Sequence, residues 1–261
     1  MLRRLNLLIK ILPFYSKPLK YVLSYYNFIK NPRFIELKTG EKFVVNDFKG
    51  DFSAIKEIYV FDEYKLNNLK LDKNPTIIDI GANIGVFSIR VAKRYSESRI
   101  FSYEPLDKTF KVLEDNIVLN NLNNTKAFNL AISDKRGKIK FHINKKNLGA
   151  SSIIKKSGDQ IEVKSITLND IFKINKISRC DLLKLDCEGA EFYIIYSTNK
   201  SNLKRIQRIV MEYHAYKDLE EITRLISFLR TNGFECFKTH INKEGSLGYI
   251  YARRMPFTNK V

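Results

Sequence analysis

From residue 75 onward, apolar runs alternate with amphipathic stretches, and this alternation predicts the order of the elements. Residues 76–80 are typical of a buried strand, and residues 84–95 have the spacing of a helix. A strand over 99–103 and a helix over 107–120, with Asp107 as its N-cap, come next. Further strands are expected over residues 126–132, 137–143, 162–166, 181–185, 208–212, 234–237 and 248–252, and further helices over 168–172 and 219–232. Such alternation predicts an α/β fold with a doubly wound, mostly parallel sheet.

The first 50 residues follow a different pattern, and we expect them to form an extension to a domain over residues 51–261. Alternation around Gly40 predicts a short hairpin over residues 34–45. Helical spacing before Pro13 predicts a helix with an apolar face formed by Leu5, Leu8, Ile9 and Leu12. Residues 51–71 are expected to be helical or mixed, with inward-facing Ile55, Ile58, Tyr59 and Phe61.

The chain of 261 residues carries 46 Lys and Arg against 28 Asp and Glu, a formal net charge of +18. Its hydrophobic content of 44% excludes a disordered chain, and no apolar run has the length of a membrane-spanning helix. Three scattered cysteines are too few for a disulfide framework, which favours a reducing, cytoplasmic location.

The positive charge is concentrated in a basic arm, residues 1–33, which contains seven basic residues, no acidic residue and several aromatics. Two interpretations of this arm stay open. It attaches peripherally to the anionic cytoplasmic face of a membrane, or it packs on the domain with its lysines in solvent.

A glycine-rich turn stands where the strand over 76–80 meets the following helix. Gly81 and Gly85 allow a tight turn and the close approach of a ligand, and Glu104 ends the next strand, where a carboxylate can bind ribose hydroxyls. A dinucleotide site would have a glycine at the position of Asn83. Asp79, two residues before the first glycine, suits a cationic ligand such as the amino-acid end of S-adenosylmethionine. The alternative is a tight turn without a ligand.

With these residues the chain resembles the FkbM-type S-adenosylmethionine-dependent methyltransferases over roughly residues 50–253. The landmarks of the resemblance are residues 78–88, 103–105, 129–134, 151–153, 181–191 and 211–214. The resemblance implies a class I, Rossmann-like methyltransferase fold with a seven-stranded sheet, preceded here by the basic helical and hairpin extension. It also implies methylation of hydroxyl groups on sugars, polyketide-like molecules or glycolipids.

The resemblance further implies roles for individual residues in binding S-adenosylmethionine. The methionine part of the cofactor would be wrapped by residues of the glycine-rich turn: Asp79, Gly81, Ala82, Asn83 and Gly85. Glu104 would hold the ribose, and the segment from Ala131 to Asp134 would flank the adenine.

Acidic residues and a histidine follow two later strands, at the sheet edge where the methyl group of the cofactor should point. A sugar hydroxyl is a poor nucleophile at neutral pH, so a neighbouring base would help. We expect His214 or Glu188 to be this base, and Asp186 to position cofactor or substrate. The alternatives are a structural His214 and a Glu191 that only stabilises a helix N-terminus. A divalent cation could be held by Asp186, Glu188, Glu212 and His214. No spacing signature demands such a site, and no metal is expected.

The sequence thus predicts an S-adenosylmethionine-dependent methyltransferase that O-methylates a saccharide or glycolipid hydroxyl, with a small-molecule or saccharide substrate that could be lipid-linked. One alternative is an RNA ribose or other nucleic-acid methyltransferase, which suits the net charge of +18. Acidic residues at 186–189 argue against a nucleic-acid partner. A nicotinamide-dependent oxidoreductase and a non-catalytic cofactor-fold scaffold at a membrane are the other rivals. The polar segment 144–160 is a candidate substrate loop or lid, and the alternative is a disordered connector.

Overall fold

A seven-stranded sheet forms the centre of the computed structural model, which describes residues 2–143, 159–215 and 219–256. The strand order is β11-β12-β10-β9-β3-β4-β5. The strands are β3 (Thr76–Ile80), β4 (Arg99–Tyr103), β5 (Thr125–Phe128), β9 (Leu182–Leu185), β10 (Arg208–His214), β11 (Phe234–His240) and β12 (Leu247–Arg254). Strands β5, β4, β3, β9 and β10 are parallel, and β12 is antiparallel to both neighbours. The expected mostly parallel, seven-stranded sheet is confirmed.

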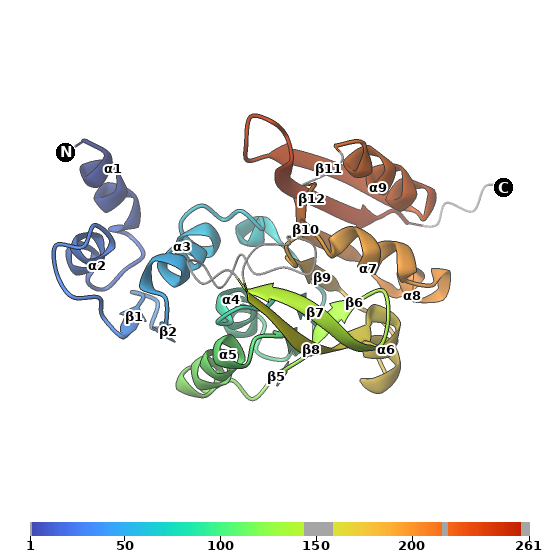
Figure 1. Ribbon diagram of the computed structural model, residues 1–261, viewed down its shortest axis with the longest axis horizontal. Coiled ribbons are helices and arrows are strands. Elements are labelled where there is room, and N and C mark those ends of the chain that lie inside the picture. The colour runs from blue at the N-terminus through green and yellow to red at the C-terminus, as the bar shows by residue number, and fades with distance from the viewer. Residues whose placement is uncertain (1, 144–158, 216–218, 257–261) are drawn as a thin grey trace.

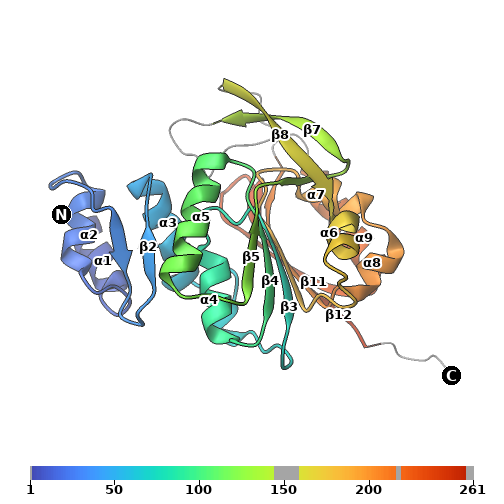
Figure 2. The ribbon, with the colours of Figure 1, turned by 90° about the horizontal axis from the view of Figure 1, so that it is seen from below.

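Helices cover both faces of this sheet, as expected for a doubly wound fold (Figure 2). On one face lie α3 (Phe48–Tyr59), α4 (Val86–Arg94) and α5 (Asp107–Leu119). On the other face lie α6 (Leu168–Ile174), α7 (Glu191–Ser197), α8 (Lys200–Arg205) and α9 (Glu220–Thr231). A short 3₁₀ helix, η1 (Leu66–Asn68), precedes β3. The expected Asp107 N-cap is wrong, because Leu106 holds that position and Asp107 is the first helical residue.

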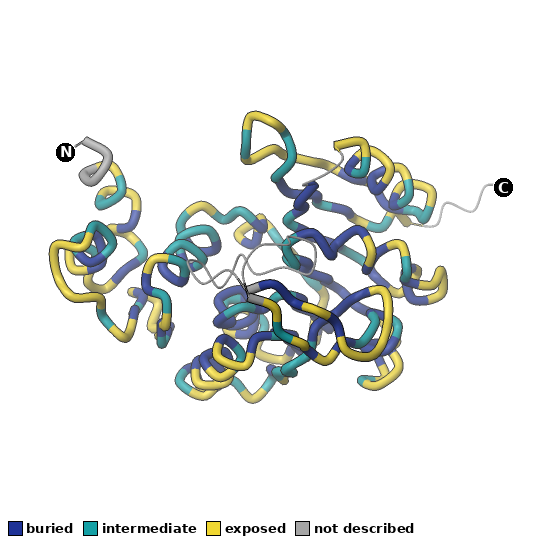
Figure 3. The backbone as a smooth tube through the Cα atoms, viewed as in Figure 1, coloured by how far each residue is buried: buried dark blue, intermediate teal, exposed yellow. Residues whose placement is uncertain are grey.

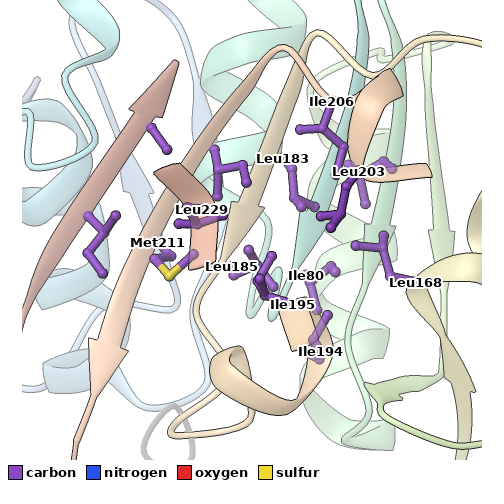
Figure 4. Close-up of a cluster of buried hydrophobic side chains, with 14 of the residues drawn as sticks. Ile80, Leu168, Leu183, Leu185, Ile194, Ile195, Leu203, Ile206, Met211 and Leu229 are labelled. Carbon is purple, nitrogen blue, oxygen red and sulfur yellow. The ribbon is translucent and has the colours of Figure 1, made fainter. Parts of the chain in front are cut away.

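The hydrophobic core lies between the sheet and its two helical layers, and the buried positions gather along the strands (Figure 3). Figure 4 shows the cluster on the α6–α9 side, where strand residues pack against residues of these helices. Its labelled members include Ile80, Leu183, Leu185 and Met211 from the strands, and Ile194, Ile195, Leu203 and Leu229 from the helices. Because both faces of the parallel strands are buried, these strands are nearly continuous apolar runs.

The single strand expected over 126–132 is wrong, because the chain leaves the central sheet at residue 129. Asn129 donates hydrogen bonds of 3.2 Å to the carbonyl oxygens of Glu104 and Pro105, and this turn ends β5. The following β6 (Ala131–Ser133) joins a separate three-stranded sheet with β7 (Gly137–Ile143) and β8 (Asp159–Thr167). The strand expected over residues 137–143 is confirmed, and it pairs antiparallel with β8. The candidate loop over 144–160 lies outside the described residues, except for its last two positions in β8.

The N-terminal part of the chain packs at one end of the molecule, next to α3 (Figure 1). It contains α1 (Leu2–Ile11), α2 (Pro18–Tyr25), β1 (Phe34–Glu36) and β2 (Lys42–Val44). β1 and β2 form the expected hairpin, and Asn116 of α5 accepts a 2.6 Å hydrogen bond from the backbone N–H of Val44. Tyr15 and Tyr21 belong to the same buried cluster as Phe52 of α3. The expected division after residue 50 therefore falls inside α3 and inside one hydrophobic cluster.

The apolar residues of this part divide between the core and the surface, and the expectation that Phe61 faces inward is wrong. Ile9 is 58% exposed and Leu12 is 45% exposed, whereas Ile11 is fully buried. Leu8 and Ile11, three residues apart in α1, pack in this cluster, so the buried face of α1 differs from the expected apolar face. Phe61 is also exposed, because it follows the end of α3.

Within the described residues, no helix is both long and apolar enough to cross a membrane.

Candidate active site

The turn between β3 and α4 forms the floor of the candidate site at the carboxyl ends of the parallel strands. Gly81 has a φ of +73°, and a side chain there would collide with the backbone carbonyl of Asp186. Asn83 has a φ of +51°, a left-handed conformation that Asn tolerates better than most residues. The turn thus brings the end of β3 against the loop after β9.

Next to this turn lies a first cavity of about 610 Å³, which includes its open mouth. Gly81, Asn83, Glu104 and Ala131 line it, as predicted for the cofactor site. Its other lining residues are mostly apolar: Ile80, Tyr103, Pro105, Leu106, Thr109, Leu130, Ile132, Phe141, Asp186, Cys187 and Glu188. Of the other predicted cofactor residues, Asp79, Ala82, Gly85 and Asp134 are described in the structure but are not among the lining residues.

Glu104 supplies a buried carboxylate to the first cavity. Its Oε2 accepts a 3.0 Å hydrogen bond from the N–H of Asn83, and its Oε1 accepts one of 3.0 Å from the N–H of Leu106. Burial raises the pKa of Glu104 to about 7, against the lowering effect of these two bonds. Each oxygen keeps a second lone pair for a ligand hydroxyl. A carboxylate between apolar walls therefore fits a nucleoside with its ribose on Glu104 and its base in the apolar part.

Asp79 acts inside the turn and is fully buried. Its carboxylate accepts a 2.6 Å hydrogen bond from Ser88 and forms a 3.1 Å ion pair with the Nζ of Lys184 on the neighbouring strand. That ammonium also donates a 2.5 Å hydrogen bond to the carbonyl oxygen of Gly81. Burial disfavours the charged amine, but Asp79 and Asp186 outweigh it and hold the pKa of Lys184 above its usual value. Asp79 is thus placed to hold the turn through Lys184 rather than to line the cavity.

The loop between β9 and α7 presents Glu188 to the site. Glu191, the first residue of α7, is fully buried and accepts hydrogen bonds from the N–H groups of Cys187 (2.6 Å) and Gly189 (2.9 Å). Between these anchors Glu188 has a φ of +52°, an unusual conformation for a residue other than glycine. Glu191 therefore fixes the conformation of the loop that carries Glu188. This role goes beyond that of a favourable charge at the N-terminus of α7.

A second, more open cavity of about 960 Å³ adjoins the first. Asn83, Asp186 and Glu188 line both cavities, so these three residues mark the junction between them. The remaining lining residues come from β10 and from the N-terminal part: Glu212, Tyr25, Asp47, Lys49, Gly50, Ser53, Ala54 and Glu57. A ligand in the first cavity and a ligand in the second would meet at Asp186 and Glu188.

His214 lies among carboxylates from three elements. Its Nδ1 is 3.3 Å from Oε1 of Glu191, and its Nε2 is 3.7 Å from both Glu188 and Glu212. Burial lowers the pKa of His214, but the negative charges of Glu191, Glu188 and Asp186 outweigh it and raise that pKa to about 10. A protonated imidazole cannot accept another proton. His214 as the base therefore does not fit this geometry, although its proximity to Glu188 was expected.

Glu212, in the same group, has a pKa raised well above its usual range by burial and by the charge of Asp186. Its carboxyl group holds its proton more tightly than an exposed one would. In the described part of the chain, no group of three or more His, Cys, Asp and Glu side chains has the arrangement of a metal site.

Two residues that shape this site were given no role by sequence reasoning. Tyr64 donates a 3.0 Å hydrogen bond to Oδ2 of Asp186, and Lys184 places its ammonium 3.7 Å from the same oxygen. The signal for Lys184 was a charged residue in the middle of an apolar strand. Tyr64 lies in an irregular segment that has no comparable signal.

The mostly parallel seven-stranded sheet, with a cavity and a buried carboxylate at the carboxyl ends of its strands, fits the class I, Rossmann-like methyltransferases. A family model described as the methyltransferase FkbM domain matches residues 79–236. The chain belongs to this family and is an S-adenosylmethionine-dependent methyltransferase.

Two relatives have similar sequences, and a solved structure has a similar fold. Methyltransferase sdnD of Sordaria araneosa is 25% identical over 213 residues, which cover 69% of this chain and 81% of that protein. The 31-O-demethyl-FK506 methyltransferase FkbM of Streptomyces tacrolimicus is 22% identical over 211 residues, covering 69% and 80%. The crystal structure of a methyltransferase FkbM from Methylobacillus flagellatus KT has a similar fold, with a TM-score of 0.54 at 12% identity. That match covers 76% of this chain and 47% of the solved chain, about half its length.

Proposed function

We propose that the enzyme transfers the methyl group of S-adenosylmethionine to a hydroxyl group of a saccharide, free or carried on a glycolipid. The observation that carries this proposal is the position of Glu188, a carboxylate at the junction of the two cavities. The name of the Streptomyces relative describes methylation at an oxygen atom, which supports a hydroxyl acceptor here.

When bound, the cofactor supplies a methyl group that its sulfonium already activates. The chain has to bring an acceptor hydroxyl in line with that group and take up its proton as the new C–O bond forms. The methyl–sulfur bond would break in the same step, and its electron pair would stay on sulfur in the product S-adenosylhomocysteine. Glu188 is the base in this proposal. Its carboxylate lines both cavities, so it would lie next to the acceptor hydroxyl that gives up a proton. Asp186, held by Tyr64 and Lys184, orients the hydroxyl with its free lone pairs.

The polar lining of the second cavity supports a polyhydroxyl acceptor. Carboxylates can accept several hydrogen bonds from sugar hydroxyls, and Ser53 can donate and accept. An apolar acceptor would leave these groups without partners, which costs free energy on binding.

The experiment that tests this function follows labelled methyl groups from S-adenosylmethionine into methyl glycosides and extracted saccharides and glycolipids. Transfer to a hydroxyl group gives a methyl ether that survives mild base, whereas transfer to a carboxyl group gives a base-labile methyl ester. Base-stable label is expected in methyl ether groups on the hydroxyl oxygens of saccharides. Label only in esters or amines would contradict O-methylation.

We also propose that the basic arm attaches the enzyme peripherally to the cytoplasmic face of a membrane. Ile9, Leu12 and Leu19 are exposed large apolar residues. Exposed basic side chains accompany them: Lys10, Lys17, Lys20, Lys30 and Arg33. Apolar side chains beside lysines suit a surface of anionic lipids.

Vesicles of phosphatidylcholine, with and without phosphatidylserine, test the membrane proposal. The double variant Ile9→Ser and Leu12→Ser should lose binding to the anionic vesicles and keep its affinity for S-adenosylhomocysteine. Val118→Ser removes an exposed apolar residue from α5 and is the matched control. Equal vesicle binding by the double variant and the wild type would contradict the proposal.

A further inference from the structure

The second cavity has two walls of different origin. Asn83, Asp186, Glu188 and Glu212 form one wall, and they lie within the segment that matches the family model. The other wall comes from residues 25–57, which precede that segment. We call the second set the N-terminal wall: Tyr25, Asp47, Lys49, Gly50, Ser53, Ala54 and Glu57.

Packing and hydrogen bonds hold the N-terminal wall in a defined position. The opposite side of α3 is anchored by Phe52, whose ring lies 5.3 Å from that of Tyr15 and is stacked on Phe48. Buried Asp51 accepts hydrogen bonds from the N–H groups of Asn46 (2.8 Å) and Asp47 (3.1 Å), which fixes the turn before α3. Since one face of α3 is held in the core, its other face is presented to the cavity in a defined orientation.

Tyr25 is held against the same helix. The Nζ of Lys56 lies 4.6 Å from the centre of the Tyr25 ring and 5.1 Å from that of Phe52. A cation over two rings ties α2 to α3. The position of the N-terminal wall thus depends on contacts that involve α2, α3 and the turn between β2 and α3.

Among the described residues that line this cavity, acidic side chains outnumber basic ones, although the chain as a whole is basic. Among its lining residues, Asp47, Glu57, Asp186, Glu188 and Glu212 are acidic, whereas Lys49 is basic. The chain as a whole has a formal net charge of +18. Burial, followed by the charges of Glu63 and Asp186, raises the pKa of Glu57 to about 7, as expected where carboxylates crowd one another.

We infer that the second cavity, which the N-terminal wall completes, admits uncharged hydroxyl-bearing groups and excludes anionic groups such as phosphates. The inference rests on the proposed function, which makes this cavity the acceptor site. Carboxyl groups can bind neutral hydroxyls as acceptors or, when protonated, as donors. A phosphate in the same place would face the carboxylates of Asp47, Asp186 and Glu188 across a partly enclosed space, even where Glu57 and Glu212 hold their protons.

Thiol labelling measures this local charge without knowledge of the natural acceptor. Ser53→Cys places a thiol in the cavity, and Val118→Cys places one on an exposed part of α5. Each variant is treated with a cationic and an anionic methanethiosulfonate of similar size, and the wild type gives the background from the native cysteines. The quantity compared is the ratio of the cationic to the anionic labelling rate.

We expect this ratio to be at least about tenfold higher for Ser53→Cys than for Val118→Cys. Equal ratios at the two positions, or preference for the anionic reagent in the cavity, would overturn the inference. Ala54→Cys serves as the second cavity variant if the first does not fold, as judged by its thermal unfolding.

Failure of the inference can be separated from failure of the proposed function. Wild-type protein is titrated with S-adenosylhomocysteine and assayed for methyl transfer to saccharides in parallel. If transfer is found but the labelling ratios are equal, only the charge selection of the cavity is overturned. If transfer to saccharides is absent while the ratio is high, the acceptor assignment fails and the cavity charge stands.

Discussion

The phenol of Tyr64 donates a 3.0 Å hydrogen bond to Oδ2 of Asp186, although 122 residues separate the two in the chain. Tyr64 is itself fixed by rings on two sides, with centroids 5.6 Å from Phe87 and 5.4 Å from Tyr249. Because Tyr64 precedes the family-matched segment, this bond ties the N-terminal part of the chain to the junction of the two cavities.

Tyr64→Phe removes this hydrogen bond and keeps the packing of the ring. A hydrogen bond to a charged group contributes about 1.5–3 kcal/mol, so kcat should fall by about tenfold or more. The affinity for S-adenosylhomocysteine should stay within about twofold of the wild type, because Tyr64 does not line the first cavity. Tyr95→Phe, which removes a 2.8 Å bond to the carbonyl of Leu69, is the control. A kcat unchanged by Tyr64→Phe would show that Asp186 needs no such support.

Glu188→Gln replaces the proposed base with an amide of the same shape. Methyl transfer should fall by about 10²–10⁴-fold, the range found for the loss of a general base. Binding of S-adenosylhomocysteine, measured by calorimetry, should change little. Glu162→Gln, at an exposed position in β8, should leave both quantities unchanged. A Glu188→Gln variant with nearly full activity would rule out Glu188 as the base.

His214 makes stability depend on pH. Its pKa is about 10 in the fold and about 6.5 as the ordinary value, so the fold binds this proton more tightly than the unfolded chain does. The stabilisation is fully present below pH 6.5 and is lost as the pH rises through 10. The unfolding free energy of His214→Asn should therefore lie furthest below that of the wild type near pH 6.5, and the gap should narrow toward pH 10. A gap that is constant over this interval in urea unfolding would contradict this account.

Lys184→Met leaves the buried carboxylate of Asp79 without its ion-pair partner. The loss of one partner of a buried pair costs about 3–5 kcal/mol, so the urea midpoint should fall sharply. Adding Asp79→Asn should recover part of this loss, since the unpaired charge is then removed. Lys138→Met, in an exposed pair with Glu162, should change stability by less than about 1 kcal/mol. Equal effects of Lys184→Met and Lys138→Met would refute the role of the buried pair.

The sequence was sufficient for the central sheet and for the carboxylate that floors the first cavity. Apolar runs predict buried parallel strands, and the carboxyl ends of such strands meet at one edge, which places Glu104 beside Gly81. The change of sheet at Asn129 escaped prediction, because it depends on side-chain bonds to carbonyl groups 24 and 25 residues earlier in the chain.

Roles that depend on pairing between distant elements could not be predicted. Asp79 and Lys184 are opposite each other on neighbouring strands, and the register that pairs them is a property of the assembled sheet. His214 is a plausible base at a strand end until Glu188 and Glu191 are seen around it. The N-terminal wall depends on which side of α3 faces the core, and periodicity alone does not say what its other side meets.

The most direct test of the account is a calorimetric titration of the wild type and Glu104→Ala with S-adenosylhomocysteine, with NAD as the comparison ligand. Glu104 joins the two backbone N–H groups at the floor of the first cavity and offers its remaining lone pairs to a ribose. We predict saturable binding of S-adenosylhomocysteine to the wild type, no binding of NAD, and affinity at least about 100-fold weaker in the variant. Equal affinity of the two proteins, or saturable binding of NAD alone, would contradict the assignment of this cavity to the cofactor.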